Sequence, residues 1–237
     1  FSAEPERFRY GPGRAMKAID WTSWQLADSA FPAGGFAHSS GLESAWRQGL
    51  VEDARSLERF LCAALVATGH GLVPFLVTAH AGNESLEQVD SWCEAFLANH
   101  VTNRASRAQG RAFLAAVEAA YGLPEITSLR DAVAEGDLCG HQAPLFGHTA
   151  ALLGLPRERA VMLFLYIQLR DTVSAAIRLN IVGPLAGQSL LSHLSRFVEQ
   201  LAEQSLDRPL AAAAQTSPVI ELVAQRHDRL YSRLFQS

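Results

Sequence analysis

Hydrophobic residues recur along most of the chain at the three- and four-residue spacing of an amphipathic helix. This spacing dominates from residue 19 onward, and no segment shows the convincing alternation of apolar and polar residues that is typical of a strand. The clearest example covers residues 190–201, where Leu190, Leu194 and Leu201 share one face with their apolar neighbours. The middle of the segment 156–180 is apolar on all sides, which is typical of a helix buried at the centre of a domain.

Glycine and proline mark most of the expected helix boundaries. Asn83 is expected to cap one helix, and Ser217 followed by Pro218 is expected to begin the last one. We predict a single all-α globular domain of about ten helices over residues 18–237, preceded by a flexible N-terminal tail, residues 1–17. The expected helices cover residues 20–30, 39–48, 53–80 with a break near the glycines and proline at 69–74, 83–98, 102–121, 125–135, 145–153, 156–180, a segment carrying 190–201, and a final segment carrying 220–235.

The composition adds a size and a charge to this picture. The 237 residues are 49% hydrophobic and only 19% charged, with a formal net charge of −4. Such a chain can bury a sizeable core, and its slight acidity disfavours a broad nucleic-acid-binding surface. A protein with so few charges is also expected to cover part of its surface with a partner.

Three further features exclude function classes. Lys17 is the only lysine and lies outside any glycine-rich turn, which disfavours a P-loop nucleotide hydrolase. The three cysteines form no close pair, which favours a reducing, cytoplasmic compartment over a disulfide framework. The longest apolar run, residues 161–167, is too short to span a bilayer, and we expect no membrane partner. Residues 1–17 lack an initiator methionine and do not resemble a signal peptide, so we interpret the sequence as trimmed or partial.

The most unusual local sequence is SAFPAGGFAHSSGLE, residues 29–43. Its glycines and proline predict a tight, specified turn between two helices, and Phe36 within it must be buried or docked on something. The turn is either an interhelical connection whose aromatic ring fills the core or a recognition loop. His38 next to Ser39 could suggest a nucleophile, but no G-x-S-x-G turn surrounds them and no third catalytic group is identifiable.

Three weaker candidates remain. Cys139, His141 and His148 could hold a metal, although they form no closed four-ligand set and isolated histidines and cysteines are more often ordinary core or surface residues. Arg170, Asp171 and Arg178 lie close to one helical face, as internal ion pairs or as a polar seam at an interface. The last residues combine apolar anchors with arginines, which is typical either of a helix that docks in a groove or of one that packs on its own core; they are Arg229, Tyr231, Arg233, Leu234 and Phe235.

Several segments resemble, in the same order, the motifs of the urease accessory protein F family. The signature-like segment is WQLADSAFPAGGFAHSSGLESAWRQGLV, residues 24–51. The others are TNRASRAQGRAFL at 102–114, HQAPLFG at 141–147, LRDTVSAAIRLNIVGPLAGQ at 169–188 and SPVIELVAQRHDRLYSRLFQS at 217–237. The wording of RLNIVGPL and APLFG is most similar to the plant-like branch. The resemblance covers about residue 19 to residue 237.

The resemblance implies a non-enzymatic, dimeric scaffold for urease maturation. Such a scaffold joins accessory protein D, also called H, and recruits and regulates the GTPase accessory protein G, so that nickel reaches apo-urease. Nickel and GTP would be handled by the assembled complex, with no cofactor bound tightly by this chain. Matched motif by motif, the resemblance assigns Phe36, His38, Ser39 and Glu43 to the face that meets the GTPase. It assigns Arg170, Asp171 and Arg178 to an interface or its support, and the C-terminal residues 229, 231 and 233–235 to accessory protein D.

Two other functions stay open at this point. One is an autonomous nickel carrier that uses Cys139, His141 and His148. The other is a small-molecule enzyme with its pocket in the helical bundle, for which the loops supply no identifiable set of catalytic acids.

If the C-terminal residues only anchor a partner, replacing Arg233 and Phe235 by alanine is expected to weaken the contact with accessory protein D and leave the fold intact.

Overall fold

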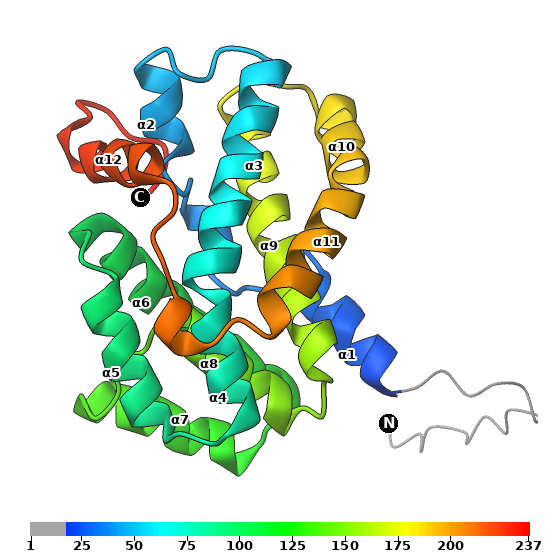
Figure 1. Cartoon of the computed structure of the whole chain (residues 1–237), viewed down its shortest axis with the longest axis vertical. Helices are drawn as coiled ribbons and strands as arrows, with labels where there is room; N and C mark the ends of the chain where they lie inside the picture. The colour runs from blue at the N-terminus through cyan, green and yellow to red at the C-terminus, as the bar shows by residue number, and fades with distance from the viewer. Residues whose placement is uncertain (1–17) are drawn as a thin grey trace, which may run out of the picture.

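A computed structural model describes residues 18–237 of the chain, and the predicted N-terminal tail, residues 1–17, lies outside the described residues. Within that range every regular element is helical, which confirms the all-α prediction (Figure 1). The helices are α1 (Ala18–Ala27), α2 (Leu42–Arg47), α3 (Ala54–Gly71), α4 (Val73–Ala81), α5 (Leu86–Phe96), α6 (His100–Tyr121), α7 (Pro124–Glu135), α8 (Gln142–Leu152), α9 (Arg157–Arg178), α10 (Pro184–His193), α11 (Ser195–Leu206) and α12 (Pro218–Gln225). Short 3₁₀ turns occur at Gly35–Ala37, Leu210–Ala212 and Arg226–Arg229.

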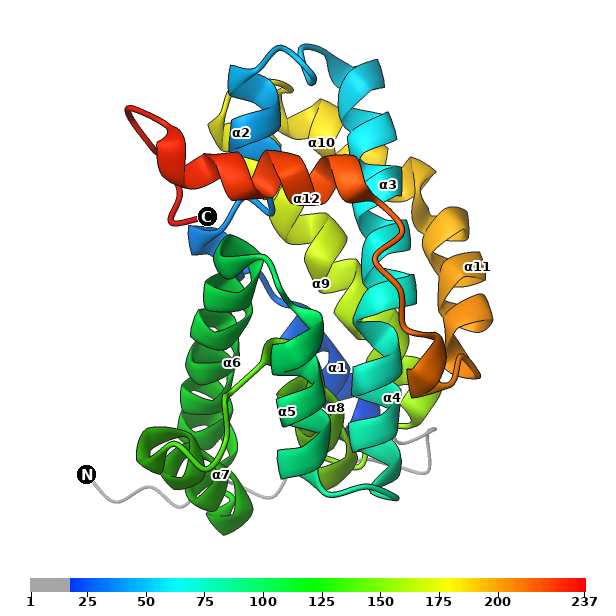
Figure 2. The same ribbon diagram turned by 60° about the vertical axis from the view of Figure 1, so that its left-hand side comes forward.

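Helix α9 is the centre of the domain, as its all-round apolar sequence predicts. It packs against α1, α2, α3, α4, α8, α10 and α11 (Figures 1 and 2). Phe164 of α9 lies 5.3 Å from Phe146 of α8, which in turn lies 5.1 Å from Phe113 of α6, measured between ring centroids. These three mutually tilted rings join the central helix α9 to α8 and α6.

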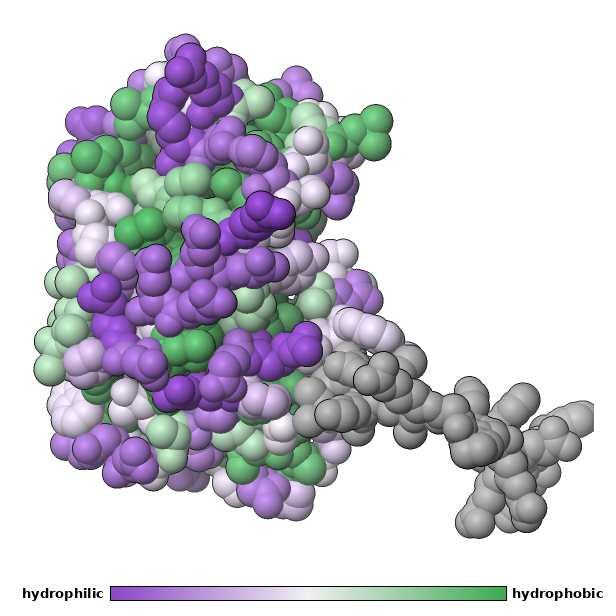
Figure 3. Space-filling model, turned by 45° about the vertical axis from the view of Figure 1, so that its right-hand side comes forward, coloured by the Kyte–Doolittle hydropathy of each residue, from purple (hydrophilic) through white to green (hydrophobic). Residues whose placement is uncertain are grey.

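Two stretches, α3–α4 and α9, are long and apolar enough to cross a membrane by length and composition alone. More than half of each apolar window is buried inside the domain, as in the core helices of a soluble fold. Both stretches are longer than residues 161–167, the longest apolar run identified from the sequence. In the fold they are helices of the hydrophobic core. The face carrying α10 and α11 shows bands of hydrophilic side chains with small apolar patches between them (Figure 3).

Three sequence-based boundaries were wrong. Ser85, not Asn83, caps α5, because its hydroxyl accepts a hydrogen bond from the Gln88 amide at 3.3 Å. The amphipathic segment around 190–201 is two helices, since the chain changes direction at the buried Leu194 so that α10 and α11 can both pack on α9. The last helix ends at Gln225 instead of continuing to residue 235.

The early end of α12 has a tertiary cause. Beyond the 3₁₀ turn Arg226–Arg229, the backbone amides of Leu234, Phe235 and Gln236 donate to acceptors on α2 and on the loop before it. Those amides are thereby withdrawn from helical hydrogen bonding. Ser217 does begin α12, but its hydroxyl donates to the Ala63 carbonyl of α3 at 3.2 Å and does not cap the helix.

Candidate functional site

The glycine loop, defined here as residues 28–41, connects α1 to α2 in a tightly specified conformation. Gly34 and Gly41 have φ angles of +80° and +83°, in the region that favours glycine. Ser40 also has a positive φ of 53°, which is uncommon for a residue with a side chain. Backbone strain of this kind persists only where the surrounding structure holds it, so the loop is built into the fold.

Helix α9 supports the glycine loop through a partly buried ion pair, Arg170 with Asp171. The Arg170 guanidinium donates to the Asp171 carboxylate at 2.9 and 2.7 Å and to the Ala27 carbonyl at 2.7 Å. Gly35 lies so close to Asp171 that any side chain at position 35 would collide with the carboxylate. Burial raises the pKa of Asp171, and the adjacent Arg170 opposes that rise. The predicted polar seam of α9 is therefore bonded to its own chain.

The C-terminal segment, defined here as residues 226–237, lies against α2 and the glycine loop (Figure 2). Its anchor is Glu43 of α2, whose side chain has 0% exposure. The Glu43 carboxylate accepts hydrogen bonds from the Leu234 amide at 2.8 Å and the Phe235 amide at 3.1 Å. It also accepts from Nε2 of His227 at 3.3 Å. A buried carboxylate is tolerable only with such donors, so Glu43 fixes the path of the segment.

A second set of hydrogen bonds joins Ser237 to the loop. Its backbone oxygen accepts from the Ser39 amide at 2.6 Å and from the Ser39 hydroxyl at 2.9 Å. Its hydroxyl lies 2.6 Å from Nδ1 of His38. Burial, with smaller contributions from the charges of Arg104 and His227, lowers the pKa of His38 to about 4. His38 is therefore neutral at pH 7, and its partner is Ser237, not the adjacent Ser39.

Arg178, at the end of α9, completes the contact between the two segments. Its guanidinium lies 3.6 Å from the ring centroid of Phe36 and 4.1 Å from that of Phe235. It also donates to the Phe36 carbonyl. Because one cation contacts an aromatic ring from each segment, Arg178 holds the loop and the C-terminal segment together.

The outer side of this arrangement carries apolar side chains that the fold does not bury. Phe36 is 62% exposed, Leu234 is 58% exposed and Tyr231 is fully exposed. Arg229 is exposed beside them in the sequence, and Arg233 pairs with Asp228 at 3.2 Å. We call the glycine loop and the C-terminal segment together the composite surface. Exposed aromatic and aliphatic anchors next to arginines are the chemistry of protein recognition.

The structure brings together two residue sets that the sequence analysis assigned to different faces. Among them Phe36, Arg229, Tyr231, Arg233 and Leu234 are exposed, whereas His38, Ser39, Glu43 and Phe235 are buried between the two segments. Sequence reasoning missed His227 and Asp228. His227 follows the buried Val223 by four residues, so its place on the inner face was available as a signal. Asp228 binds Arg104 at 2.8 Å and His100 at 3.1 Å, and nothing in the sequence indicated these distant partners.

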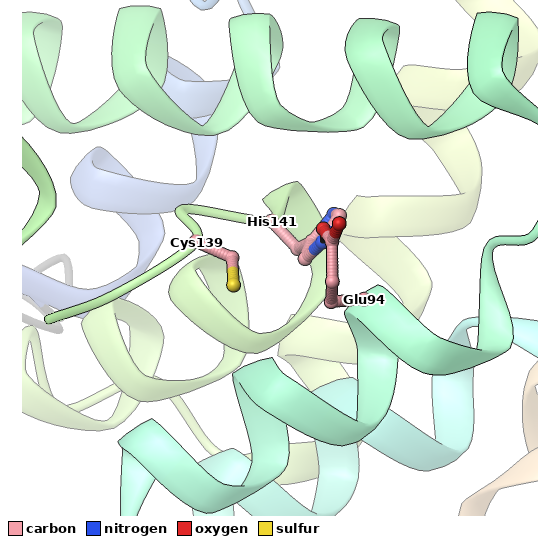
Figure 4. Close-up of side chains that lie close together, drawn as sticks. All are labelled: Glu94, Cys139 and His141. Carbon is pink, nitrogen blue, oxygen red and sulfur yellow. Dashed lines mark hydrogen bonds and ion pairs between the residues drawn. The ribbon is translucent and has the colours of Figure 1, made fainter. Parts of the chain in front are cut away.

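Of the predicted metal ligands, the structure brings Cys139 and His141 together and leaves out His148. Their neighbour is Glu94 of α5, which the sequence analysis did not name (Figure 4). Asp90 and Glu94 are four residues apart on α5 and so share a face, a spacing that could have pointed to them.

The fold and the composite surface define an all-helical protein that displays a rigid loop locked to its own C-terminal segment. A model of the UreF family matches residues 51–195. The chain is 37% identical to urease accessory protein F of Arabidopsis thaliana, over 99% of each chain. It is 36% identical to urease accessory protein F of Oryza sativa subsp. indica, over 91% of this chain and 84% of the relative. It is 32% identical to urease accessory protein UreF of Cereibacter sphaeroides strain KD131, over 94% and 98%. The chain belongs to the UreF family, and its predicted likeness to the plant branch is confirmed.

Proposed function

We propose that this chain is a non-enzymatic scaffold in the maturation of urease. It joins accessory protein D, or H, and recruits and regulates the GTPase accessory protein G, so that nickel is inserted into apo-urease. Membership of the UreF family supports the maturation role. The exposed anchors of the composite surface support the binding of protein partners, because the fold leaves Phe36, Tyr231 and Leu234 uncovered.

The observation that carries the proposal is the shared support of the loop and the C-terminal segment. Glu43 and Arg178 each contact both parts of the composite surface. The Glu43 amide donates to the Ser39 hydroxyl at 3.4 Å and its carboxylate accepts from the Leu234 amide, while Arg178 contacts Phe36 and Phe235. A partner that binds the C-terminal segment therefore changes the restraint on the loop, and the coupling works equally in the other direction. This gives a physical route by which binding of accessory protein D prepares the face for the GTPase.

The remaining parts of the proposal concern the assembly. The chain acts as a homodimer in the cytoplasm, without nucleic-acid or membrane partners. Nickel and GTP are handled by the assembled complex, and the scaffold role itself requires no cofactor bound tightly by this chain. A nucleotide switch in the GTPase then alters its affinity for the scaffold, in the way that other nucleotide-dependent assemblies are switched.

The test is size-exclusion chromatography with light scattering on the chain alone and co-expressed with accessory proteins D and G. We expect a dimer alone, a co-eluting complex with D, and uptake of G in the presence of a GTP analogue and magnesium. The double variant Tyr231→Ala/Leu234→Ala is expected to lose D. The matched control is Leu185→Ala on α10, which removes an 88% exposed apolar side chain elsewhere. Elution of the wild-type chain without either partner would contradict the proposal.

A further inference from the structure

A second cluster of chemically reactive side chains lies where the start of α8 meets α5, outside the composite surface. Glu94 comes from α5, while Cys139 and His141 come from the loop that leads into α8 (Figure 4). One oxygen, one sulfur and one nitrogen from these residues lie within 4.8 Å of one another. We propose that Glu94, Cys139 and His141 bind one borderline divalent transition-metal ion, of the class of Ni²⁺, Co²⁺ and Zn²⁺.

The donor atoms suit this class of ion. Thiolate and imidazole select borderline transition metals over Mg²⁺ or Ca²⁺, and a carboxylate completes a three-ligand set with one position left open. In a tetrahedral site with bonds of 2.0–2.3 Å the ligand atoms lie about 3.3–3.8 Å apart. Ligand atoms that are as much as 4.8 Å apart must therefore approach one another by about 1 Å when an ion binds. The 2.7 Å distance between His141 Nε2 and the Glu94 carboxylate must lengthen to admit the ion.

The imidazole of His141 is oriented for ligation by its other nitrogen. Nδ1 lies 3.1 Å from the Ser106 hydroxyl oxygen, which also accepts a hydrogen bond from the Gln142 amide at 3.2 Å. At 2.7 Å from the Glu94 carboxylate, Nε2–H donates to it while no ion is bound. An ion at this position requires the other tautomer, in which Nδ1–H is donated to Ser106 and the lone pair of Nε2 faces the ion. A hydrogen-bond acceptor of this kind behind a histidine fixes its tautomer and strengthens it as a ligand.

The backbone that carries two of the ligands is held rigidly. The buried carboxylate of Asp90 accepts hydrogen bonds from the Gly140 and His141 amides, both at 2.9 Å. Arg107 of α6 donates to the Cys139 carbonyl at 3.0 Å. Gly110 allows α6 to approach so closely that a side chain there would collide with the Gly140 carbonyl. The ligands therefore need little ordering when an ion binds.

Access and charge also favour a cation at this position. The His141 side chain is fully buried, whereas that of Glu94 is 40% exposed, so an ion arriving from solvent meets the imidazole at the floor of the site. The carboxylates of Asp90 and Glu94 outnumber the single guanidinium of Arg107 near the cluster. This local excess of negative charge attracts a positive ion.

The site is independent of the scaffold role and is tested on the isolated full chain. After treatment with a chelator and a reductant, the protein is titrated with Co²⁺ and with Ni²⁺ by calorimetry and absorbance. We expect one equivalent per chain and a thiolate-to-cobalt charge-transfer band. Cys139→Ser is expected to remove the band and weaken binding tenfold or more, and Glu94→Gln to weaken binding while keeping the band.

Two controls keep the result interpretable. Cys62→Ser changes a half-buried thiol on α3 and is expected to leave stoichiometry, affinity and band unchanged. Circular dichroism checks that each variant keeps its fold, and neither Cys139 nor Glu94 is fully buried, so both tolerate conservative replacement. Absence of a charge-transfer band in the wild type, or equal affinity in wild type and Cys139→Ser, would overturn the proposal. Because no partner protein is present, this outcome is separate from any failure of the scaffold role.

Discussion

Glu43 and His227, 184 residues apart in the sequence, meet in a fully buried contact of 3.3 Å between Oε2 and Nε2. Nδ1 of His227 has no hydrogen-bond partner among the residues that the structure describes, so the imidazole depends on Glu43 alone. Burial lowers the pKa of His227, partly offset by the hydrogen bond to Glu43. This contact ties the end of the chain to the helix that follows the glycine loop.

Removing the Glu43 carboxylate is expected to release the C-terminal segment. In Glu43→Ala the Leu234 and Phe235 amides lose their acceptor, and His227 loses its partner. Breaking a buried polar network of this kind costs about 3 kcal/mol in the free energy of unfolding. Urea denaturation measures the loss, and hydrogen exchange locates it at residues 234 and 235. Glu203→Gln, an exposed carboxylate on α11, is the control; equal stability and equal protection of the two variants would contradict this account.

Acidification is expected to weaken the contact between the glycine loop and the C-terminal segment through His38, which lies against Ser237. Its pKa is about 4 in the folded chain and 6.5 in the unfolded chain, so the unfolded state binds the proton more tightly. The stabilisation is complete above pH 6.5 and is lost as the pH falls from 6.5 to 4. Between pH 7.5 and pH 5 the loss is about 2 kcal/mol.

The measurement is the difference in unfolding free energy between these two pH values, for wild type and His38→Asn. In His38→Asn the change in unfolding free energy between the two pH values should be smaller than in the wild type by about 2 kcal/mol, the contribution of His38. A full pH dependence in His38→Asn would show that His38 is not its source.

Arg178 should be sensitive even to a conservative change. Lysine keeps the positive charge but loses the planar guanidinium that contacts Phe36 and Phe235. Arg178→Lys is expected to lower the unfolding free energy by about 1–2 kcal/mol and to increase the mobility of the glycine loop. NMR relaxation of the loop amides reports the mobility, with Arg196→Lys on α11 as control. Unchanged loop relaxation in Arg178→Lys would refute the role assigned to the stacking.

Within the C-terminal segment, neighbouring residues should separate folding from binding. Phe235 is 4% exposed, so Phe235→Ala is expected to cost about 3 kcal/mol of stability. The sequence analysis expected the fold to stay intact when Phe235 is replaced; the burial of its side chain predicts a loss of stability instead. Leu234→Ala is expected to leave the melting temperature nearly unchanged and to weaken binding of accessory protein D by about 1–2 kcal/mol. Thermal melts and titration calorimetry measure the two effects, and the opposite pattern would contradict the placement of these side chains.

Replacing Phe36 is expected to weaken recruitment of the GTPase accessory protein G. Its ring is exposed and lies against Arg178, so Phe36→Ala removes surface while the buried hydrogen bonds at Glu43 and Ser237 remain. We expect uptake of the GTPase to fall while binding of accessory protein D persists. Pull-downs with each partner distinguish these effects, and simultaneous loss of both would indicate misfolding instead of a lost contact.

The helical pattern predicted the fold well because apolar spacing is a local property of the sequence. It placed α9 at the centre and the breaks near Gly71 and Gly122 correctly. It failed at the end of α12, where the apolar residues up to Phe235 continue a helical spacing but their amides bond to Glu43. A pattern of side chains does not reveal that distant acceptor.

The site was only partly predictable for the same reason. The glycine-rich loop, the seam of α9 and the C-terminal anchors could each be recognised alone from their composition. Their convergence depends on long-range contacts such as Arg178 with Phe235 and Ser39 with Ser237. At the second cluster, Cys139 and His141 were found because they are neighbours in the sequence, whereas Glu94 comes from another helix and was missed.

The central claim is the scaffold role in urease maturation, and nickel delivery to urease tests it most directly. Apo-urease and its other accessory proteins are produced in cells without an accessory protein F, and this chain is supplied as wild type, Tyr231→Ala/Leu234→Ala or Leu185→Ala. We predict that the wild type and Leu185→Ala restore the nickel content and activity of the urease, and that the double variant does not. Urease that stays without nickel in the presence of the folded, soluble wild-type chain would contradict the account.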